Sequence, residues 1–186
     1  MSYLEIIIGP MFSGKTSELI KIYKEKKENN EKILAINYNM DTRYGDNKIV
    51  SHNIDSIPSI NINSLHDINS DLDRKSAFNN ADWIFINEAQ FFKDLKIFII
   101  LYLKNSNKKF VLCWLDSDFK RERFGELLDL VPHADKLTKL YGKCHYCNNK
   151  SLYTHRLTSE MHQEVIGTNN YIPICRSCCF NKINIQ

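Results

Sequence analysis

The 186-residue sequence predicts an α/β fold, in which a parallel sheet carries helices on both faces and a small zinc-binding domain follows. Three observations predict this fold. Short apolar runs alternate with longer helical patterns, which is typical of a parallel sheet. A glycine-rich phosphate-binding motif follows the first apolar run. Two Cys-x-x-Cys pairs stand near the end of the chain.

The order of elements follows from the spacing of apolar residues. Buried strands are predicted at the short apolar runs Tyr3 to Ile8, Ile33 to Tyr38, Trp83 to Ile86 and Phe110 to Leu115. Helices are predicted from Ser17 to about Asn29, within residues 65 to 80, from Phe92 to Lys104, and from Gly125 to Leu130 before Pro132. Residues 46 to 64 are weakly patterned and predict loops with a short strand near Ile57 to Ile62.

Composition and charge narrow the class of partner. The net charge of +3 is lower than a dedicated DNA-binding surface usually carries and suits small anionic substrates equally well, so we expect no nucleic-acid partner. The longest apolar run, Ile97 to Leu103, is too short to span a bilayer, and no export signal precedes the first strand. We therefore expect no membrane contact and a reducing, cytoplasmic location, where the six cysteines do not form disulfides.

Residues Gly9 to Thr16 match the phosphate-binding loop pattern Gly-x-x-x-x-Gly-Lys-Thr. Its glycines allow backbone conformations in which N–H groups converge on phosphate oxygens at a helix N-terminus. Lys15 would place a positive charge at the outer phosphates, and the Thr16 hydroxyl would bind Mg²⁺. The alternative is a glycine-rich turn that matches by chance. The strand before the motif and the helix after it favour the phosphate-binding loop, whose members are Gly9, Pro10, Met11, Phe12, Ser13, Gly14, Lys15 and Thr16.

A carboxylate follows the strand predicted at Trp83 to Ile86. Strand ends line the ligand crevice of an open parallel sheet, and P-loop enzymes usually carry an acid at the end of a neighbouring strand. Here the first polar position is Asn87 and the acid is Glu88. Glu88 would act as a general base that takes a proton from an attacking hydroxyl. The alternative is a solvent-exposed carboxylate at a strand end.

Two other strand ends carry candidate site residues. Asp41 and Arg43 follow the second strand and would bind the water ligands of the metal and neutralise phosphate charge. An Asp-initiated turn fits this segment equally well. Phe119 and Phe124 flank the charged turn after Leu115. Their rings would either stack on a base or pack in the core.

Four cysteines suit a structural zinc ion. Cys144-x-x-Cys147 and Cys175-x-x-Cys178 supply four thiolates for tetrahedral Zn²⁺, which leaves no position for a water ligand. The alternatives are buried free thiols or a redox pair. Residues 148 to 174 form a longer loop than compact zinc ribbons have, so it is expected to protrude. The residues expected not to bind the ion are Cys113, His145, His162 and Cys179.

The order of these motifs resembles the type II thymidine kinases, the zinc-containing cytosolic class. The motifs are Gly9-Pro-Met-Phe-Ser-Gly-Lys-Thr16, Asp41-Thr-Arg-Tyr44, Glu88-Ala-Gln-Phe-Phe92, Phe124-Gly125 with Leu130-Val-Pro132, and Glu164-Val-Ile-Gly167 between the cysteine pairs. The similarity covers residues 3 to 180, almost the whole chain. It implies a P-loop (RecA-like) ATP-binding domain at residues 1–141 and a zinc-binding lasso, or lid, at residues 142–186.

The resemblance also implies a reaction and its residues. ATP with Mg²⁺ would donate its γ-phosphate to the 5′-hydroxyl of thymidine, with Glu88 as the general base. ATP would be held by the phosphate-binding loop together with Asp41, Arg43, Asn87 and Gln90. Thymidine would be held by Met11, Phe91, Leu115, Phe119, Phe124, Tyr141, Val165, Ile166, Gly167 and Tyr171. A structural Zn²⁺, a homotetramer and feedback inhibition by thymidine triphosphate (dTTP) are implied as well.

Two positions depart from the family pattern. Asn87 stands where the family usually has Asp, and an amide adds no negative charge, so we expect weaker Mg²⁺ affinity with more of the task left to Asp41 and Thr16. Tyr141 stands where a small Thr is common. A ring in the pocket would crowd the thymine methyl group and let deoxyuridine compete better. Alternatively, the ring turns outward and packs under the zinc site.

Two other functions remain open from the sequence. A P-loop joined to a zinc ribbon also fits an ATPase that binds nucleic acid, although acids such as Glu160 and Glu164 interrupt the basic residues Arg156 and Arg176. A binding protein that has lost catalysis is supported only by Asn87.

Overall fold

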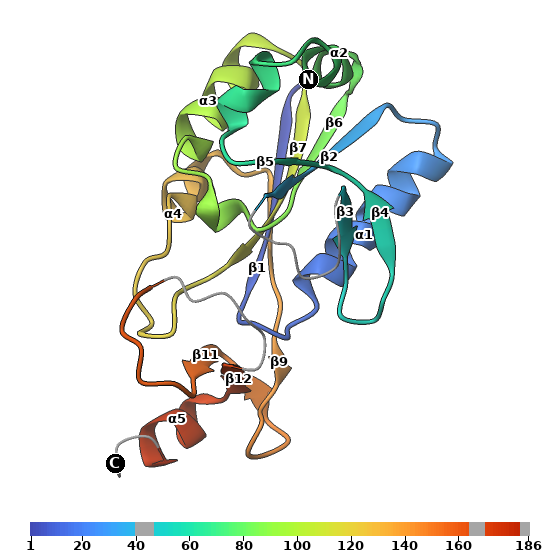
Figure 1. The fold of residues 1–186 in the computed structure, drawn as a ribbon. Coiled ribbons are helices and arrows are strands. Elements are labelled where there is room, and N and C mark those ends of the chain that lie inside the picture. Colours follow the sequence, from blue (N-terminus) through green and yellow to red (C-terminus); the bar gives the residue numbers. More distant parts are fainter. Residues whose placement is uncertain (40–46, 164–169, 183–186) are drawn as a thin grey trace.

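The computed structural model describes residues 1–39, 47–163 and 170–182. Within them, six parallel strands form one sheet with helices on both faces, and a C-terminal unit lies beyond the carboxyl ends of the strands (Figure 1). The sheet confirms the predicted α/β class. No helix in these residues is long and apolar enough to cross a bilayer. The predicted site residues Asp41, Arg43, Val165, Ile166 and Gly167 lie outside the described residues.

The strand order separates the two strands expected to carry the chemistry. The sheet consists of β1 (Tyr3–Gly9), β2 (Ile33–Tyr38), β5 (Ile60–Ile62), β6 (Trp83–Ile86), β7 (Lys109–Leu115) and β8 (Lys136–Lys139). Their spatial order is β5-β2-β6-β7-β1-β8, with parallel pairing throughout. We expected the strand before Glu88 to neighbour the P-loop strand, and this is wrong because β7 lies between β6 and β1.

Successive strand residues face opposite layers because side chains alternate along a strand. On one face, Ile6, Ile84 and Leu112 pack against the layer that contains the 3₁₀ helix η1 (Leu65–Asn69), α2 (Leu72–Asn80), α3 (Leu95–Asn105) and α4 (Leu127–Leu130). On the other face, Ile7, Phe85 and Val111 pack against α1 (Lys15–Glu28) and the hairpin of β3 (Lys48–Val50) and β4 (Ser56–Pro58). Both faces are thus covered, as Figure 1 shows.

The predicted bounds hold best for the central strands. The strands at Ile33–Tyr38 and Trp83–Ile86 begin and end where predicted. Helix α1 begins two residues earlier than predicted, since Gly14 caps it in a left-handed conformation. Residues 46 to 64 hold three short strands, more than the one predicted. The 3₁₀ helix η2 (Ala89–Phe91) delays the start of α3 to Leu95, and α4 is only four residues long before the 3₁₀ helix η3 (Val131–His133).

The C-terminal unit is built from two small antiparallel pairs and a helix. Strand β9 (Gly142–Lys143) pairs with β10 (Lys150–Ser151), and β11 (Tyr153–Arg156) pairs with β12 (Tyr171–Ile174) before α5 (Arg176–Lys182). The segment predicted as a protruding loop therefore contains three of these strands. The last sheet strand, β8, ends at Lys139, and the domain boundary at residue 141 stays a prediction.

Candidate active site and zinc centre

The phosphate-binding loop connects β1 to α1 at the carboxyl edge of the sheet. Gly9 sits where a Cβ atom would lie 2.5 Å from the Leu140 carbonyl oxygen and 2.6 Å from Ser13 Oγ, so a side chain does not fit there. Gly14 has φ 82°, a left-handed conformation that glycine adopts without a steric cost. Lys15 Nζ donates to the Pro10 carbonyl oxygen at 2.7 Å. The Lys15 side chain therefore reaches back across the loop to its second residue, Pro10.

Buried Cys113 on β7 links the P-loop to Glu88. Burial raises the pKa of the Cys113 thiol to about 12. The negative charge of Glu88 raises this pKa further, while the positive charge of Lys15 and a hydrogen bond with Thr16 lower it. Lys15 and Thr16 follow β1 and Glu88 follows β6, and these strands are parallel, so all three residues lie at the same edge of the sheet. The edge thus brings together the predicted base, the predicted phosphate-binding lysine and the predicted Mg²⁺ ligand.

Glu88 occupies a sharp turn at the end of β6. Its backbone has φ 51°, an uncommon conformation for a residue with a side chain, and it caps η2. The buried side chain of Gln90 donates a hydrogen bond from Nε2 to the Glu88 carboxylate. Glu88 itself is only partly buried. A local turn and an amide therefore fix the carboxylate where a ligand can reach it.

Asn87 has one satisfied and one unsatisfied amide atom. Its side chain is 3% exposed, and its Nδ2 donates to Asn37 Oδ1 at 2.9 Å. Among the described residues, Asn87 Oδ1 has no hydrogen-bond partner. A buried acceptor without a donor costs about 1–3 kcal/mol, so this oxygen suits a donor that a ligand brings, such as metal-bound water. Asn37 was not predicted, because nothing in its local sequence marks it.

Aromatic rings gather beside this edge. Phe91 and Phe124 meet edge to face with ring centroids 5.6 Å apart. Tyr38, at the end of β2, stacks on Phe91 at 5.1 Å and extends the same cluster. Sequence reasoning missed Tyr38, which resembles any other tyrosine at the end of a strand. Trp114 Nε1 donates to the Phe124 carbonyl oxygen at 3.1 Å and anchors the turn that carries Phe124.

The other predicted nucleoside contacts among the described residues lie where the sheet meets the C-terminal unit. Leu115 pairs with Gly9 in the sheet, and the Met11 N–H donates to Thr154 Oγ1 at 2.9 Å. Phe119 and Tyr171 lie on Arg156, which is described below. The Tyr141 side chain is 42% exposed, and the Lys150 ammonium lies 5.4 Å from its ring centroid. Tyr141 is therefore the least enclosed of these side chains.

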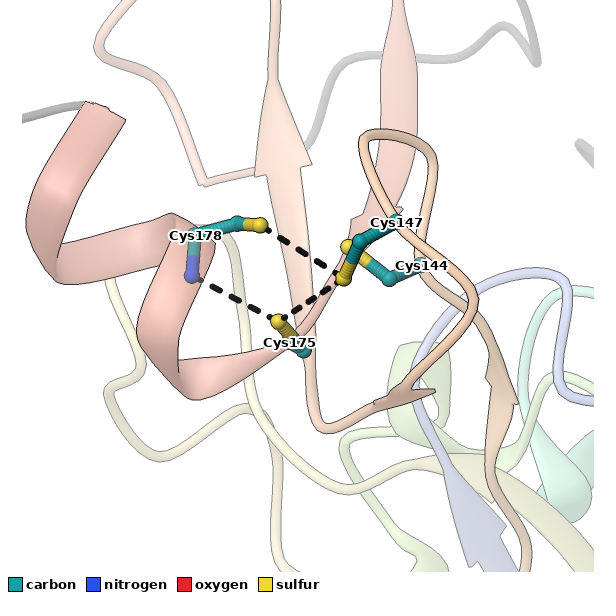
Figure 2. A group of neighbouring side chains, drawn as sticks. All are labelled: Cys144, Cys147, Cys175 and Cys178. Carbon is teal, nitrogen blue, oxygen red and sulfur yellow. Dashed lines mark hydrogen bonds between the residues drawn. The ribbon is translucent and has the colours of Figure 1, made fainter.

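The four predicted zinc ligands converge on one point. The sulfur atoms of Cys144, Cys147, Cys175 and Cys178 lie within 4.8 Å of one another. Cys147 Sγ is 3.6 Å from both Cys175 Sγ and Cys178 Sγ (Figure 2). A tetrahedron with Zn–S bonds of ~2.3 Å has edges of ~3.8 Å, so these sulfurs already have suitable spacing. Among the described residues, no histidine or carboxylate joins this group.

A bound cation would favour ionisation of all four cysteines. Burial opposes ionisation of Cys144, but hydrogen bonds from backbone N–H groups outweigh it and lower the pKa to about 6. Burial raises the pKa of Cys178 to about 12, together with its sulfur neighbours and the negative charge of Cys144. Ionising all four thiols this close together would need a metal to neutralise the charge. All six cysteines are free thiols in the structure.

Comparison with known proteins gives one consistent result. Residues 2–179 match the family model described as thymidine kinase. The chain is 40% identical over 184 residues to a thymidine kinase of Yaba monkey tumor virus, covering 98% of this chain and 96% of the relative. It is 37% identical to thymidine kinases of sheeppox virus and Dictyostelium discoideum, covering 96% and 94% of this chain and 97% and 76% of those relatives.

Proposed function

The chain belongs to the thymidine kinase family, and we propose that Glu88 is the general base of its ATP-dependent reaction. Glu88 takes the proton of the thymidine 5′-hydroxyl as that oxygen attacks the γ-phosphorus of ATP. The new O–P bond forms, the bond to the β–γ bridging oxygen breaks, and ADP leaves with that electron pair. The observation that carries this role is the partly exposed Glu88 carboxylate, held by Gln90 at the edge that also bears Lys15.

The triphosphate is assigned to the P-loop. Backbone N–H groups at the start of α1 and the Lys15 ammonium bind phosphate oxygens, so Lys15 exchanges the Pro10 carbonyl for a phosphate. Mg²⁺, when bound, neutralises charge on the β- and γ-phosphates. Thr16 would be its direct ligand, and Asn87 Oδ1, which has no partner among the described residues, would accept a hydrogen bond from a water bound to the ion. Asp41 and Arg43 are also proposed to interact with the metal ion and the phosphates.

Thymidine is assigned to the space between the aromatic cluster and the C-terminal unit. Phe91 and Phe124 supply one apolar wall, Met11 and Leu115 the floor, and Phe119 and Tyr171 the side toward the C-terminal unit. Val165, Ile166 and Gly167 are proposed to bind the base through the main chain. Tyr141 is proposed to modulate the choice between thymidine and deoxyuridine.

A structural Zn²⁺ bound by the four cysteines is proposed to hold the ends of the 148–174 segment together. Ordering a long segment has an entropic cost, which one metal reduces by joining its two ends. A positioned segment excludes water from the reacting phosphate and limits ATP hydrolysis. We propose residues 1–141 as the ATP-binding domain and residues 142–186 as this zinc-binding domain.

Three further properties are proposed on family membership. They are a homotetramer, inhibition by dTTP and a cytoplasmic location. The exposed Ile97 and Leu101 side chains on α3 supply apolar surface that assembly would cover. Sedimentation analysis tests the tetramer, and ADP release at rising dTTP concentration tests the inhibition.

One assay tests the function against its rival. We expect thymidine to stimulate ADP release strongly, while purine deoxynucleosides and single-stranded DNA do not. Stimulation by DNA alone would instead identify a nucleic-acid-dependent ATPase. No ADP release with any acceptor, in a zinc-loaded protein that binds ATP, would indicate a binding protein without catalysis.

A further inference from the structure

Arg156 is a buried cation with no part in the phosphate chemistry. It lies on β11 in the C-terminal unit, and its side chain is 4% exposed. The sequence presented Arg156 as a basic residue near the cysteines, but a side chain this buried cannot grip a nucleic-acid strand. Its guanidinium carbon lies 3.6 Å from the ring centroid of Phe119 and 5.1 Å from that of Tyr171. The charge is therefore stabilised by two aromatic rings that come from separate parts of the molecule.

The same guanidinium holds the main chain that follows β11. Arg156 Nη1 donates to the carbonyl oxygens of Glu160, at 2.8 Å, and His162. Arg156 Nη2 donates to the Gln163 carbonyl oxygen at 3.1 Å and to Tyr171 Oη at 2.6 Å. The planar guanidinium thus fixes three carbonyl groups and the orientation of one phenol ring.

Gln163 extends this arrangement to the sheet domain. Its Nε2 donates to Asp118 Oδ2 at 2.8 Å and to the Arg123 carbonyl oxygen at 3.0 Å. Asp118 is buried, and its Oδ1 accepts hydrogen bonds from the N–H groups of Lys120 and Glu122. The turn that carries Phe119 is therefore rigid, and Arg156 and Gln163 both attach the C-terminal unit to it.

We propose that Arg156 is a positioning residue that sets thymidine affinity by fixing the rings of Phe119 and Tyr171. The inference rests on the proposed function, since both rings are assigned there to the nucleoside. Phe119 belongs to the turn after β7, whereas Tyr171 belongs to β12. Arg156 lies against both rings, so it fixes the relative position of two rings of the same wall that no shared backbone element fixes. The position of this wall decides how closely it packs against a pyrimidine nucleoside.

The test is Arg156→Lys, with Arg176→Lys as the matched control. Lysine keeps the charge but lacks the planar face and the forked donors. We expect the KM for thymidine to rise about tenfold or more, while kcat and the KM for ATP stay within about twofold. Zinc content should remain complete. Arg176 begins α5 and is exposed, so the same substitution there should leave every parameter unchanged.

Tyr171→Phe provides a second, milder variant. It keeps the ring and removes only the oxygen that Arg156 binds, so we expect a smaller rise in the KM for thymidine. Its effect should not add to that of Arg156→Lys, because both changes break the same contact. If Arg156→Lys does not fold, an unchanged KM in Tyr171→Phe overturns the proposal.

The outcomes separate this inference from the proposed function. A wild-type protein without thymidine-dependent ADP release would overturn the proposed function itself. An active wild type with an unchanged KM for thymidine in Arg156→Lys would overturn the inference alone. Equal losses of zinc, ATP binding and turnover in Arg156→Lys would mean that Arg156 serves folding only, which also overturns it.

Discussion

The P-loop edge of the sheet and the C-terminal unit hold their functional groups by different means. At the sheet edge, Lys15, Thr16 and Glu88 follow strands whose positions are fixed by a large apolar core on both faces. In the C-terminal unit, the buried apolar cluster consists mainly of cysteines with Ile174. Its geometry depends on the four clustered cysteines and on one arginine instead.

Because of this difference, substitutions in the two regions should separate loss of the chemical step from loss of substrate binding. A side-chain change at the sheet edge should remove a chemical step and leave the scaffold intact, because the strands do not depend on it. A change in the C-terminal unit should alter the geometry of a whole wall, because little else holds that wall. The predictions below test this contrast, beginning with the largest expected effect.

Glu88→Gln should lower kcat by about 10²–10⁴-fold, since the amide cannot accept the hydroxyl proton. The unfolding midpoint and the affinity for ATP should stay near wild type, which calorimetry and nucleotide titration measure. Gln90→Ala is a useful companion, because it removes one hydrogen bond to the Glu88 carboxylate without removing the carboxylate, and it should have a smaller effect. Wild-type turnover in Glu88→Gln would exclude Glu88 as the base.

Loss of zinc should affect the other region first. A structural zinc site contributes an apparent ~10–16 kcal/mol to the folding of the domain around it. Cys175→Ser should therefore reduce bound zinc, expose the C-terminal unit to protease and raise the KM for thymidine by roughly 30-fold or more. ATP should still bind to the sheet domain.

Cys179→Ala is the control for that experiment. Cys179 is buried next to the ligand Cys178 but lies outside the group of four sulfurs. Metal analysis should find one zinc per chain in this variant. If Cys175→Ser loses ATP binding and thymidine binding together, the two regions do not fold independently and the contrast fails.

At the sheet edge, Asn87→Asp should change the Mg²⁺ concentration at which turnover is half-maximal. A carboxylate near the ion adds negative charge that the amide lacks, so half-maximal activity should occur at a Mg²⁺ concentration several-fold lower. The change also loses the hydrogen bond donated to Asn37, so the unfolding midpoint must be measured alongside. An unchanged Mg²⁺ dependence would show that Asn87 is not near the ion.

Tyr141→Thr should have the smallest effect. If the ring borders the thymine methyl group, the smaller side chain should raise the preference for thymidine over deoxyuridine by a few-fold, as expected for contact with one methyl group. Competition between the two nucleosides measures it. However, Tyr141 is 42% exposed, as a residue that faces solvent would be. An unchanged preference for thymidine over deoxyuridine would show that the ring faces solvent and does not contact the thymine methyl group.

The sequence alone predicts the parts of this molecule that local rules determine. The bounds of β2 and β6 follow from apolar runs with polar ends, and the P-loop and zinc ligands follow from fixed spacings. Strand β8 was missed because Lys136–Lys139 is a short, mostly polar edge strand without an apolar pattern. The contacts of Arg156 and Tyr38 were also missed. They depend on rings from distant segments, which no local spacing reveals.

The place of β7 has a consequence for the size of the reacting assembly. Neighbouring strands lie ~4.8 Å apart, so the ends of β1 and β6 are separated by roughly 10 Å. A phosphate bound at the end of β1 and a proton acceptor at the end of β6 can act on the same substrate only above the carboxyl end of β7. That strand therefore acts as a spacer, which leaves room for a triphosphate tail and a sugar lying end to end.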